Sequence, residues 1–151
     1  MSVAKPFVFA LVCDALGPDE ARRRIGVNAT GLPFNSLEAI EQARDGRTNP
    51  MVNPGAIATT SLVSGESLDD RWELLRAGLS RFAGRPLAVD EVVLRSASAT
   101  NQVNRSIANL LDSRGRIAGD VDAAVDLYTR QSSLGVTARD LAVMRSSAKP
   151  S

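Results

Sequence analysis

The sequence predicts a mainly α-helical globular domain. Apolar residues recur at spacings of three and four in several segments, almost no segment alternates as a half-buried strand does, and glycine or proline separates the helical segments. With 151 residues, of which 44% are hydrophobic, the chain can bury one core. We therefore expect a single domain over residues 1–151, in which residues 146–151 form a disordered tail.

Two helices are predicted near the N-terminus. Residues 7–12 form an uninterrupted apolar run, which predicts a buried helix that ends before Gly17. A proline and two acids follow and suit the first turn of a short helix that runs through Arg24. Residues 26–33 then predict a loop, and the next helix is expected over residues 37–43.

The clearest amphipathic helix follows Ser67. Ser67, with Asp70 three residues later, has the pattern of a helix N-cap. Apolar side chains then repeat at spacings of four, three, four and three, which places them on one face of a helix. This core-facing stripe consists of Leu68, Trp72, Leu75, Leu79 and Phe82.

Four further helices are predicted in the second half of the chain. They are a short helix over 90–94, helices over 102–112 and 121–130, and a last helix from Thr137, with an irregular link over 96–100 and a turn over 115–119. The side chains expected to face inward in the three longer helices are Val103, Ile107, Leu110, Leu111, Val125, Tyr128, Leu141 and Met144.

Composition excludes several classes of function. The net charge of +1 gives no electrostatic attraction to nucleic acid or to an anionic membrane, and no apolar stretch is long enough to span a bilayer. The single cysteine, Cys13, allows no internal disulfide and, with no signal peptide, predicts a cytoplasmic protein. Because the chain has no histidine, it cannot form a Ser-His-Asp triad, a Cys-His pair or the usual zinc sites.

Ser2 and Lys5 form a candidate nucleophile and base. Their spacing of three places both side chains on one face of a helix, so the lysine amine can reach the serine hydroxyl. Burial beside the apolar helix lowers the pKa of a lysine, and a neutral amine can take the serine proton. The same pattern also suits an N-cap serine followed by a solvated lysine.

Residues 48–57 form a second candidate site. Pro50 and Pro54 bias the preceding asparagines, Asn49 and Asn53, towards extended backbone, before a helix of small residues over 56–63. An amide held on rigid backbone offers one acceptor and two donors to a ligand. An Asx turn that caps the helix is the alternative.

In these motifs the sequence resembles the serine-dependent glutaminases, which share the fold of the beta-lactamases and penicillin-binding proteins. The order and spacing of the matching motifs along the chain carry the resemblance. They are Ser2-Val3-Ala4-Lys5, residues 30–37, residues 47–57, Asn104 with Ile107 and Ala108, and residues 126–128, 131–134 and 136–144. The resemblance implies the helical part of a beta-lactamase-like α+β fold with most of the sheet missing, and hence one partial glutaminase domain.

The resemblance implies hydrolysis of L-glutamine to L-glutamate and ammonia through a glutamyl-serine intermediate. Ser2 would be the nucleophile and Lys5 its general base, while Tyr128 would line the pocket and assist proton transfer. Asn53 and Asn104 would hold the α-amino and α-carboxylate groups of the substrate. No metal or organic cofactor is implied, the partner is the small-molecule substrate, and members of the family commonly form homo-oligomers.

The chain departs from the family pattern at several places. Pro54 stands where the family usually has a small residue, and Ala97 stands where it has a glutamate that pairs with the substrate's ammonium. The strands and tyrosines that flank this region in the family have no counterpart here. We therefore expect little or no glutaminase activity from this chain by itself.

Two other functions remain open. One is a different Ser-x-x-Lys acyl-transfer protein, such as a penicillin-recognising one, which the motif around Asn53 disfavours. The other is a non-catalytic helical remnant that assembles with a partner, which Ala97 favours. A third mechanism would use the α-amine of Ser2 as the base after removal of Met1.

Overall fold

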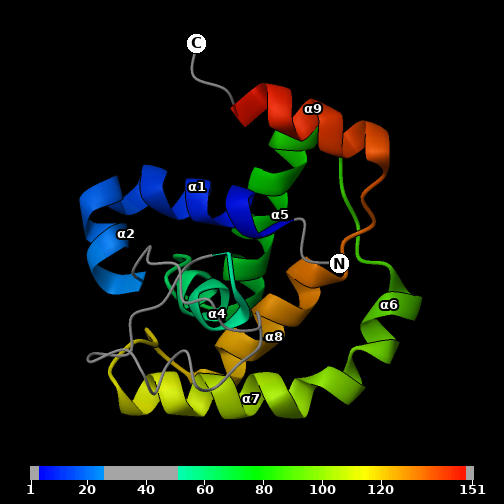
Figure 1. The fold of residues 1–151 in the computed structure, drawn as a ribbon. Helices are drawn as coiled ribbons and strands as arrows, with labels where there is room; N and C mark the ends of the chain where they lie inside the picture. The colour runs from blue at the N-terminus through cyan, green and yellow to red at the C-terminus, as the bar shows by residue number, and fades with distance from the viewer. Residues whose placement is uncertain (1–3, 26–50, 149–151) are drawn as a thin grey trace.

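The computed structural model describes residues 4–25 and 51–148. These ranges contain the helices α1 (Lys5–Leu16), α2 (Pro18–Ile25), α4 (Asn53–Ser61), α5 (Leu68–Ala83), α6 (Glu91–Ser96), α7 (Ser98–Ser113), α8 (Val121–Ser132) and α9 (Ala138–Ala148) (Figure 1). Within them the only β pairing is an isolated antiparallel bridge between Val89 and Leu134. The predicted mainly α-helical architecture is confirmed.

Helix α4 lies near the middle of the molecule. Figure 1 shows α1, α2, α7 and α8 around it, and these helices contact it. Every residue of α4 is buried. Its side chains are mostly small, so the surrounding helices can approach closely and still leave no void. Helix α4 is therefore the element around which the site and the core are arranged.

The start of α4 differs from the sequence prediction. Asn53 was expected on extended backbone, but it is the first residue of the helix, and the extended residue is Val52, with φ −105° and ψ 160°. Pro54 fits the first turn because its missing N–H has no partner in a helix start. The N–H of Ala56 donates to the carbonyl of Val52 at 2.8 Å and closes this turn. Asn49 lies outside the described residues.

The N-terminal helices follow the prediction. Helix α1 ends at Gly17, whose φ of 89° is readily accessible only to glycine, and α2 begins at once with Pro18. Val12 of α1 packs with Ala21 and Ile25 of α2 in a small apolar cluster. The loop predicted over 26–33 and the helix predicted over 37–43 lie outside the described residues.

Helix α5 confirms the predicted amphipathic stripe. The Ser67 hydroxyl accepts a hydrogen bond from the N–H of Asp70 at 3.1 Å, and Gly84 ends the helix in the left-handed conformation. Leu75 and Leu79 are fully buried. These two leucines form the core between α1, α5 and α9, together with Ala4, Phe7, Val8, Ala83, Leu87 and Met144.

The prediction of an irregular link over residues 96–100 is wrong. Helix α6 runs to Ser96 and α7 begins at Ser98, so Ala97 alone separates them. The sequence has no glycine or proline over residues 96–100, so it contains no strong helix breaker there.

The inward face of α7 also differs in one position. Val103 was expected inside but is 44% exposed, whereas Asn104 is buried. Asn104 lies four positions before Ala108 and seven before Leu111, both buried, so it shares their face of the helix. A polar side chain therefore occupies an inward position next to the core.

Helices α8 and α9 complete the bundle. Val125 and Tyr128 of α8 and Met144 of α9 are buried as predicted, and Leu141 is half-buried. Helix α9 continues to Ala148, so residues 146–148 of the expected tail are helical. The first strong helix breaker after them is Pro150, which explains the extra turn.

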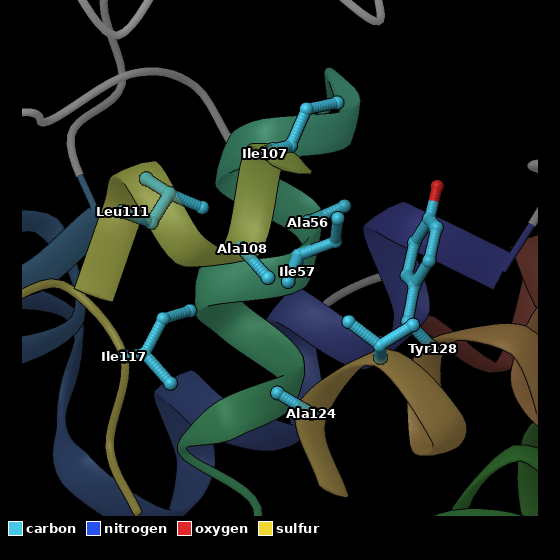
Figure 2. Packing of buried hydrophobic residues seen from close by; sticks show 9 residues of the cluster. Ala56, Ile57, Ile107, Ala108, Leu111, Ile117, Ala124 and Tyr128 are labelled. Carbon is cyan, nitrogen blue, oxygen red and sulfur yellow. The ribbon is translucent and has the colours of Figure 1, made fainter. Parts of the chain in front are cut away.

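The core nearest the candidate site joins α4, α7 and α8. Figure 2 shows its buried side chains, which are Ala56, Ile57, Ile107, Ala108, Leu111, Ile117, Ala124, Val125 and Tyr128. The ring of Tyr128 packs against this cluster, and its hydroxyl points away from Ala124. Among the described residues, no helix is long and apolar enough to cross a membrane.

Candidate active site

Three polar side chains meet at the N-terminal end of α4. The amine Nζ of Lys5 donates a hydrogen bond to Oδ1 of Asn53 at 2.7 Å. The hydroxyl of Tyr128 donates to the same Oδ1 at 2.8 Å. All three residues are buried, with exposed fractions of 6%, 8% and 3%. One amide oxygen therefore holds the predicted base and the predicted tyrosine together.

Three different helices supply these residues. Lys5 is the first residue of α1, and Asn53 is the first residue of α4. Tyr128 lies on the inward face of α8, where its ring belongs to the apolar cluster of Figure 2. Because each side chain is anchored by its own packed helix, the constellation is held by rigid elements.

The environment of Lys5 favours its neutral form. Burial lowers the pKa of the Lys5 amine, because the charged form loses its hydration. Asn53 is a neutral acceptor and cannot compensate as a carboxylate would. A lowered pKa makes a larger fraction of a lysine neutral at a given pH, and a neutral amine can accept a proton.

Asn104 lies on the buried face of α7, the helix that packs against α4 and α8, and among the described residues no hydrogen bond joins it to the cluster. Its side chain is 8% exposed, and it sits three positions before Ile107, which contacts the core around α4. Within the described ranges, the Asn104 amide and the Nδ2 group of Asn53 form no hydrogen bond. Buried amide groups without partners are uncommon, and those at a site are available to a ligand.

Ser2 lies outside the described residues, so its placement near Lys5 stays a prediction. Ala97, where the resemblance implies a glutamate in the family, forms the half-buried turn between α6 and α7. The described residues contain no group of His, Cys, Asp or Glu side chains that could hold a metal ion.

Sequence reasoning missed the buried polar contacts that surround the site. The Thr60 hydroxyl donates to Oε1 of Gln131 at 3.0 Å, joining α4 to α8. The Thr129 hydroxyl donates to Oδ1 of Asn101 at 3.0 Å, joining α8 to α7. These contacts could have been expected from the positions of the residues on the inward side of their helices. Thr129 follows Tyr128, and Asn101 lies one turn before Asn104.

Comparison with known proteins now places the chain in a family. The family model described as "Glutaminase" matches residues 1–148. The chain belongs to the glutaminase family. It is 62% identical over 144 residues to Glutaminase 2 of Yersinia pestis, a match that covers 95% of this chain and 42% of that protein.

Solved structures agree with this placement. A crystal structure of a Bacillus glutaminase superimposes with a TM-score of 0.90 at 29% identity and covers 95% of this chain and 49% of that one. The protein Mglu, in a structure described as its glutamate form, superimposes with a TM-score of 0.85 at 32% identity, covering 95% and 33%. The predicted helical part of a beta-lactamase-like fold is thereby confirmed, and the chain spans less than half the length of these relatives.

Proposed function

We propose that this chain carries the acyl-transfer site of a glutaminase, which hydrolyses L-glutamine to L-glutamate and ammonia. The observation that supports it most is the buried Lys5–Asn53–Tyr128 cluster, in a chain that belongs to the glutaminase family. In a sequence without histidine, the buried Lys5 amine, whose pKa is lowered by desolvation, takes the part of the base.

In the proposed reaction, the Ser2 hydroxyl attacks the side-chain amide carbon of glutamine. The lone pair of the neutral Lys5 amine takes the hydroxyl proton as the new C–O bond forms. The resulting ammonium returns this proton to the leaving nitrogen, and ammonia departs as the C–N bond breaks. Water then attacks the glutamyl-serine ester while Lys5 takes a proton from it, and the bond between the carbonyl carbon and Oγ of Ser2 breaks. Lys5 returns the proton to Oγ, which restores Ser2 and releases glutamate.

The remaining residues position the substrate. Asn53 and Asn104 hold its α-carboxylate and α-amino groups, and Tyr128 assists proton transfer between the leaving nitrogen and Lys5. Ala97 offers no charge to the substrate ammonium. Loss of such a charge-assisted contact costs about 1.5–3 kcal/mol of binding, so we expect weak substrate affinity.

We further propose that residues 1–151 act as one part of a larger catalytic domain, in the cytoplasm, and as a homo-oligomer with no nucleic-acid or membrane partner. The net charge of +1 and the single cysteine support the location and the partners. The coverage of 42% of the Yersinia pestis relative supports a partial domain. A non-catalytic helical unit is the second candidate, because Ala97 removes the family's ammonium contact.

The experiment that tests the function is ammonia release from L-glutamine by the purified chain, beside Ser2→Ala and with L-asparagine as the competing substrate. We expect slow release from glutamine that disappears in Ser2→Ala. A folded chain that releases no ammonia would contradict the proposal for this chain and favour the non-catalytic unit. Activity that survives Ser2→Ala would contradict the assigned nucleophile.

The variant Ala97→Glu tests the assignment of the substrate ammonium. If a carboxylate at this turn reaches the substrate as in the family, KM for glutamine falls by about 10-fold or more, the equivalent of at least 1.4 kcal/mol. The control is Val92→Glu on the exposed face of α6, where the residue is 68% exposed and the new charge should leave KM unchanged.

A further inference from the structure

Oδ1 of Asn53 has no capacity for a third partner. An amide oxygen has two lone pairs, and Oδ1 accepts one hydrogen bond from Lys5 at 2.7 Å and one from Tyr128 at 2.8 Å. In the structure the oxygen of the Asn53 amide, not its nitrogen, faces both the Lys5 amine and the Tyr128 hydroxyl. A ligand can therefore meet Asn53 only through its Nδ2 group.

The same bond controls the direction of the Lys5 lone pair. A neutral amine has two N–H groups and one lone pair. When one N–H is directed to Oδ1 of Asn53, the lone pair must point elsewhere and cannot be consumed by this contact. An acceptor at this position therefore leaves the amine able to act as a base, whereas a donor there would have occupied its lone pair.

We propose that Asn53 is a positioning residue that sets the orientation and the proton affinity of Lys5 and Tyr128 together, through one shared amide oxygen. The role rests on the proposed function for its use in catalysis, but the coupling itself is a property of the folded chain. It assigns to Asn53 a task beyond substrate contact, because its oxygen serves the protein and its nitrogen serves the ligand.

Charges on the neighbouring helices do not account for the coupling. Helix α4 carries no charged side chain. On α8, Asp126 pairs with Arg130 at 2.9 Å, and Asp122 pairs with Arg105 of α7 at 3.4 Å.

The other helices packed against α1 place their charges elsewhere. Asp14 is exposed near the far end of α1. On α5 and α9, Glu73 pairs with Arg76, and Asp140 pairs with Arg85. Helices α2, α5 and α9 carry further charged side chains, none of which is fully buried. They are Asp19, Glu20, Arg22, Arg23, Arg24, Asp69, Asp70, Arg71, Arg81, Arg139 and Arg145.

The composition of the chain makes the coupling measurable without an activity assay. Tyr128 is the only tyrosine, so the absorbance change on tyrosinate formation reports this residue alone. Lys5 and Lys149 are the only lysines, so NMR of ¹³C-labelled lysine shows two signals, and Lys149→Arg identifies the one from Lys5. Both pKa values can be followed in folded protein.

The test compares Asn53→Asp and Asn53→Ala with the control Asn101→Ala. Asn53→Asp keeps the shape of the side chain and adds a negative charge, so the pKa values of Lys5 and Tyr128 should both rise by about one pH unit or more. Asn53→Ala removes the acceptor and should lower the pKa of Lys5 further. Asn101 also accepts a hydrogen bond between α7 and α8, which is partly buried, and its loss should leave both pKa values unchanged.

The outcomes separate this inference from the proposed function. If both titrations are unaltered in folded Asn53→Asp, the positioning role is overturned, even if the chain hydrolyses glutamine. If the titrations follow Asn53 but the chain releases no ammonia, the coupling stands and the glutaminase proposal fails for this chain. If Asn53→Ala does not fold, as judged by circular dichroism, the isosteric Asn53→Asp carries the test.

Discussion

The two ends of α4 differ in how completely their buried polar groups are hydrogen-bonded. At the C-terminal end, the Ser61 hydroxyl accepts from the N–H of Ala118 at 3.1 Å, and Arg71 donates to the carbonyls of Ser61 and Val63 at 3.0 and 2.9 Å. At the N-terminal end, Oδ1 of Asn53 is saturated, but its Nδ2 group and the Asn104 amide have no partner in the described part of the chain.

This difference separates structural polar groups from groups available to a ligand. A buried polar group that is fully hydrogen-bonded has no capacity left for a substrate. A buried group with unpaired donors destabilises the folded chain until a ligand accepts hydrogen bonds from it. The C-terminal end of α4 therefore fixes the helix in place. The N-terminal end is where a ligand restores the missing hydrogen bonds.

The largest expected effect is on the N-terminal end, in Lys5→Met. We expect the rate of ammonia release to fall by about 10²–10⁴-fold, the usual contribution of a general base. Stability at pH 7 should not fall, because methionine fills similar space and removes the cost of burying the amine. Ammonia release and urea denaturation of the same preparations measure the two effects, and a large loss of stability would contradict this assignment.

The pH dependence of stability gives a second measure of Lys5. The pKa of Lys5 is lowered in the folded chain, so the folded state binds fewer protons than the unfolded state between the lowered value and the ordinary value near 10.4. Stability should therefore rise with pH across this window, and the Lys5→Met variant should lack that rise.

The same substitution at the other end should have the opposite effect. Arg71→Met leaves two carbonyls at the end of α4 without their donors, and hydrogen bonds to a charged group contribute about 1.5–3 kcal/mol each. We expect the free energy of unfolding to fall by roughly 2–4 kcal/mol. Arg105→Met is the control, because its surface pair with Asp122 at 3.4 Å should contribute less than about 1 kcal/mol.

Two buried side-chain amides on the helices next to α4 should show the same difference between its two ends, with a smaller effect on stability. Gln131→Leu removes the side-chain acceptor of the Thr60 hydroxyl, which keeps the Ala56 carbonyl at 2.9 Å as its second acceptor, and should cost about 1 kcal/mol of stability, measured by urea denaturation. Asn104→Leu removes an amide that has no partner in the described chain, so stability should be unchanged or higher while glutamine binding weakens. If Asn104→Leu destabilises the chain as much as Gln131→Leu does, Asn104 is structural.

The sequence was sufficient to predict most of the described helices, and the roles of the candidate site residues stay predictions. The caps at Gly17, Ser67 and Gly84, and the stripe that includes Leu75 and Leu79, depend on local conformation and periodicity, which a single sequence contains. The family motifs supplied Lys5 and the other candidates, although no local rule brings them together.

The errors occurred where tertiary packing or a local competition decides. Both outcomes at Asn53 are compatible with a following proline, and the helix start prevailed because α4 is buried along its whole length. The inward position of Asn104 instead of Val103 depends on which face of α7 meets α4 and α8. The shared acceptor between Lys5 and Tyr128 joins residues 123 positions apart and could not be inferred from spacing.

The smallest expected effect lies far from both ends, at the start of α9. Asp140 accepts from Arg85 and from the N–H of Thr137 at 2.9 Å, and these contacts hold its pKa well below the ordinary value. A lowered folded pKa stabilises the chain above the unfolded value near 3.9, and this contribution is lost as the pH falls below it. Asp140→Asn should therefore lower Tm by about a few degrees at pH 7 and by less near pH 3.

The pH dependence of stability that Asp140 causes at acid pH is a control for the pH dependence assigned to Lys5. Because Lys5 acts on the alkaline side and Asp140 on the acid side, the two variants should change separate parts of the stability profile. Thermal unfolding of both variants and their double mutant, followed by circular dichroism from pH 3 to pH 10, should give additive changes. A change in the alkaline profile of Asp140→Asn would show that the pH dependence assigned to the N-terminal end of α4 arises elsewhere in the bundle.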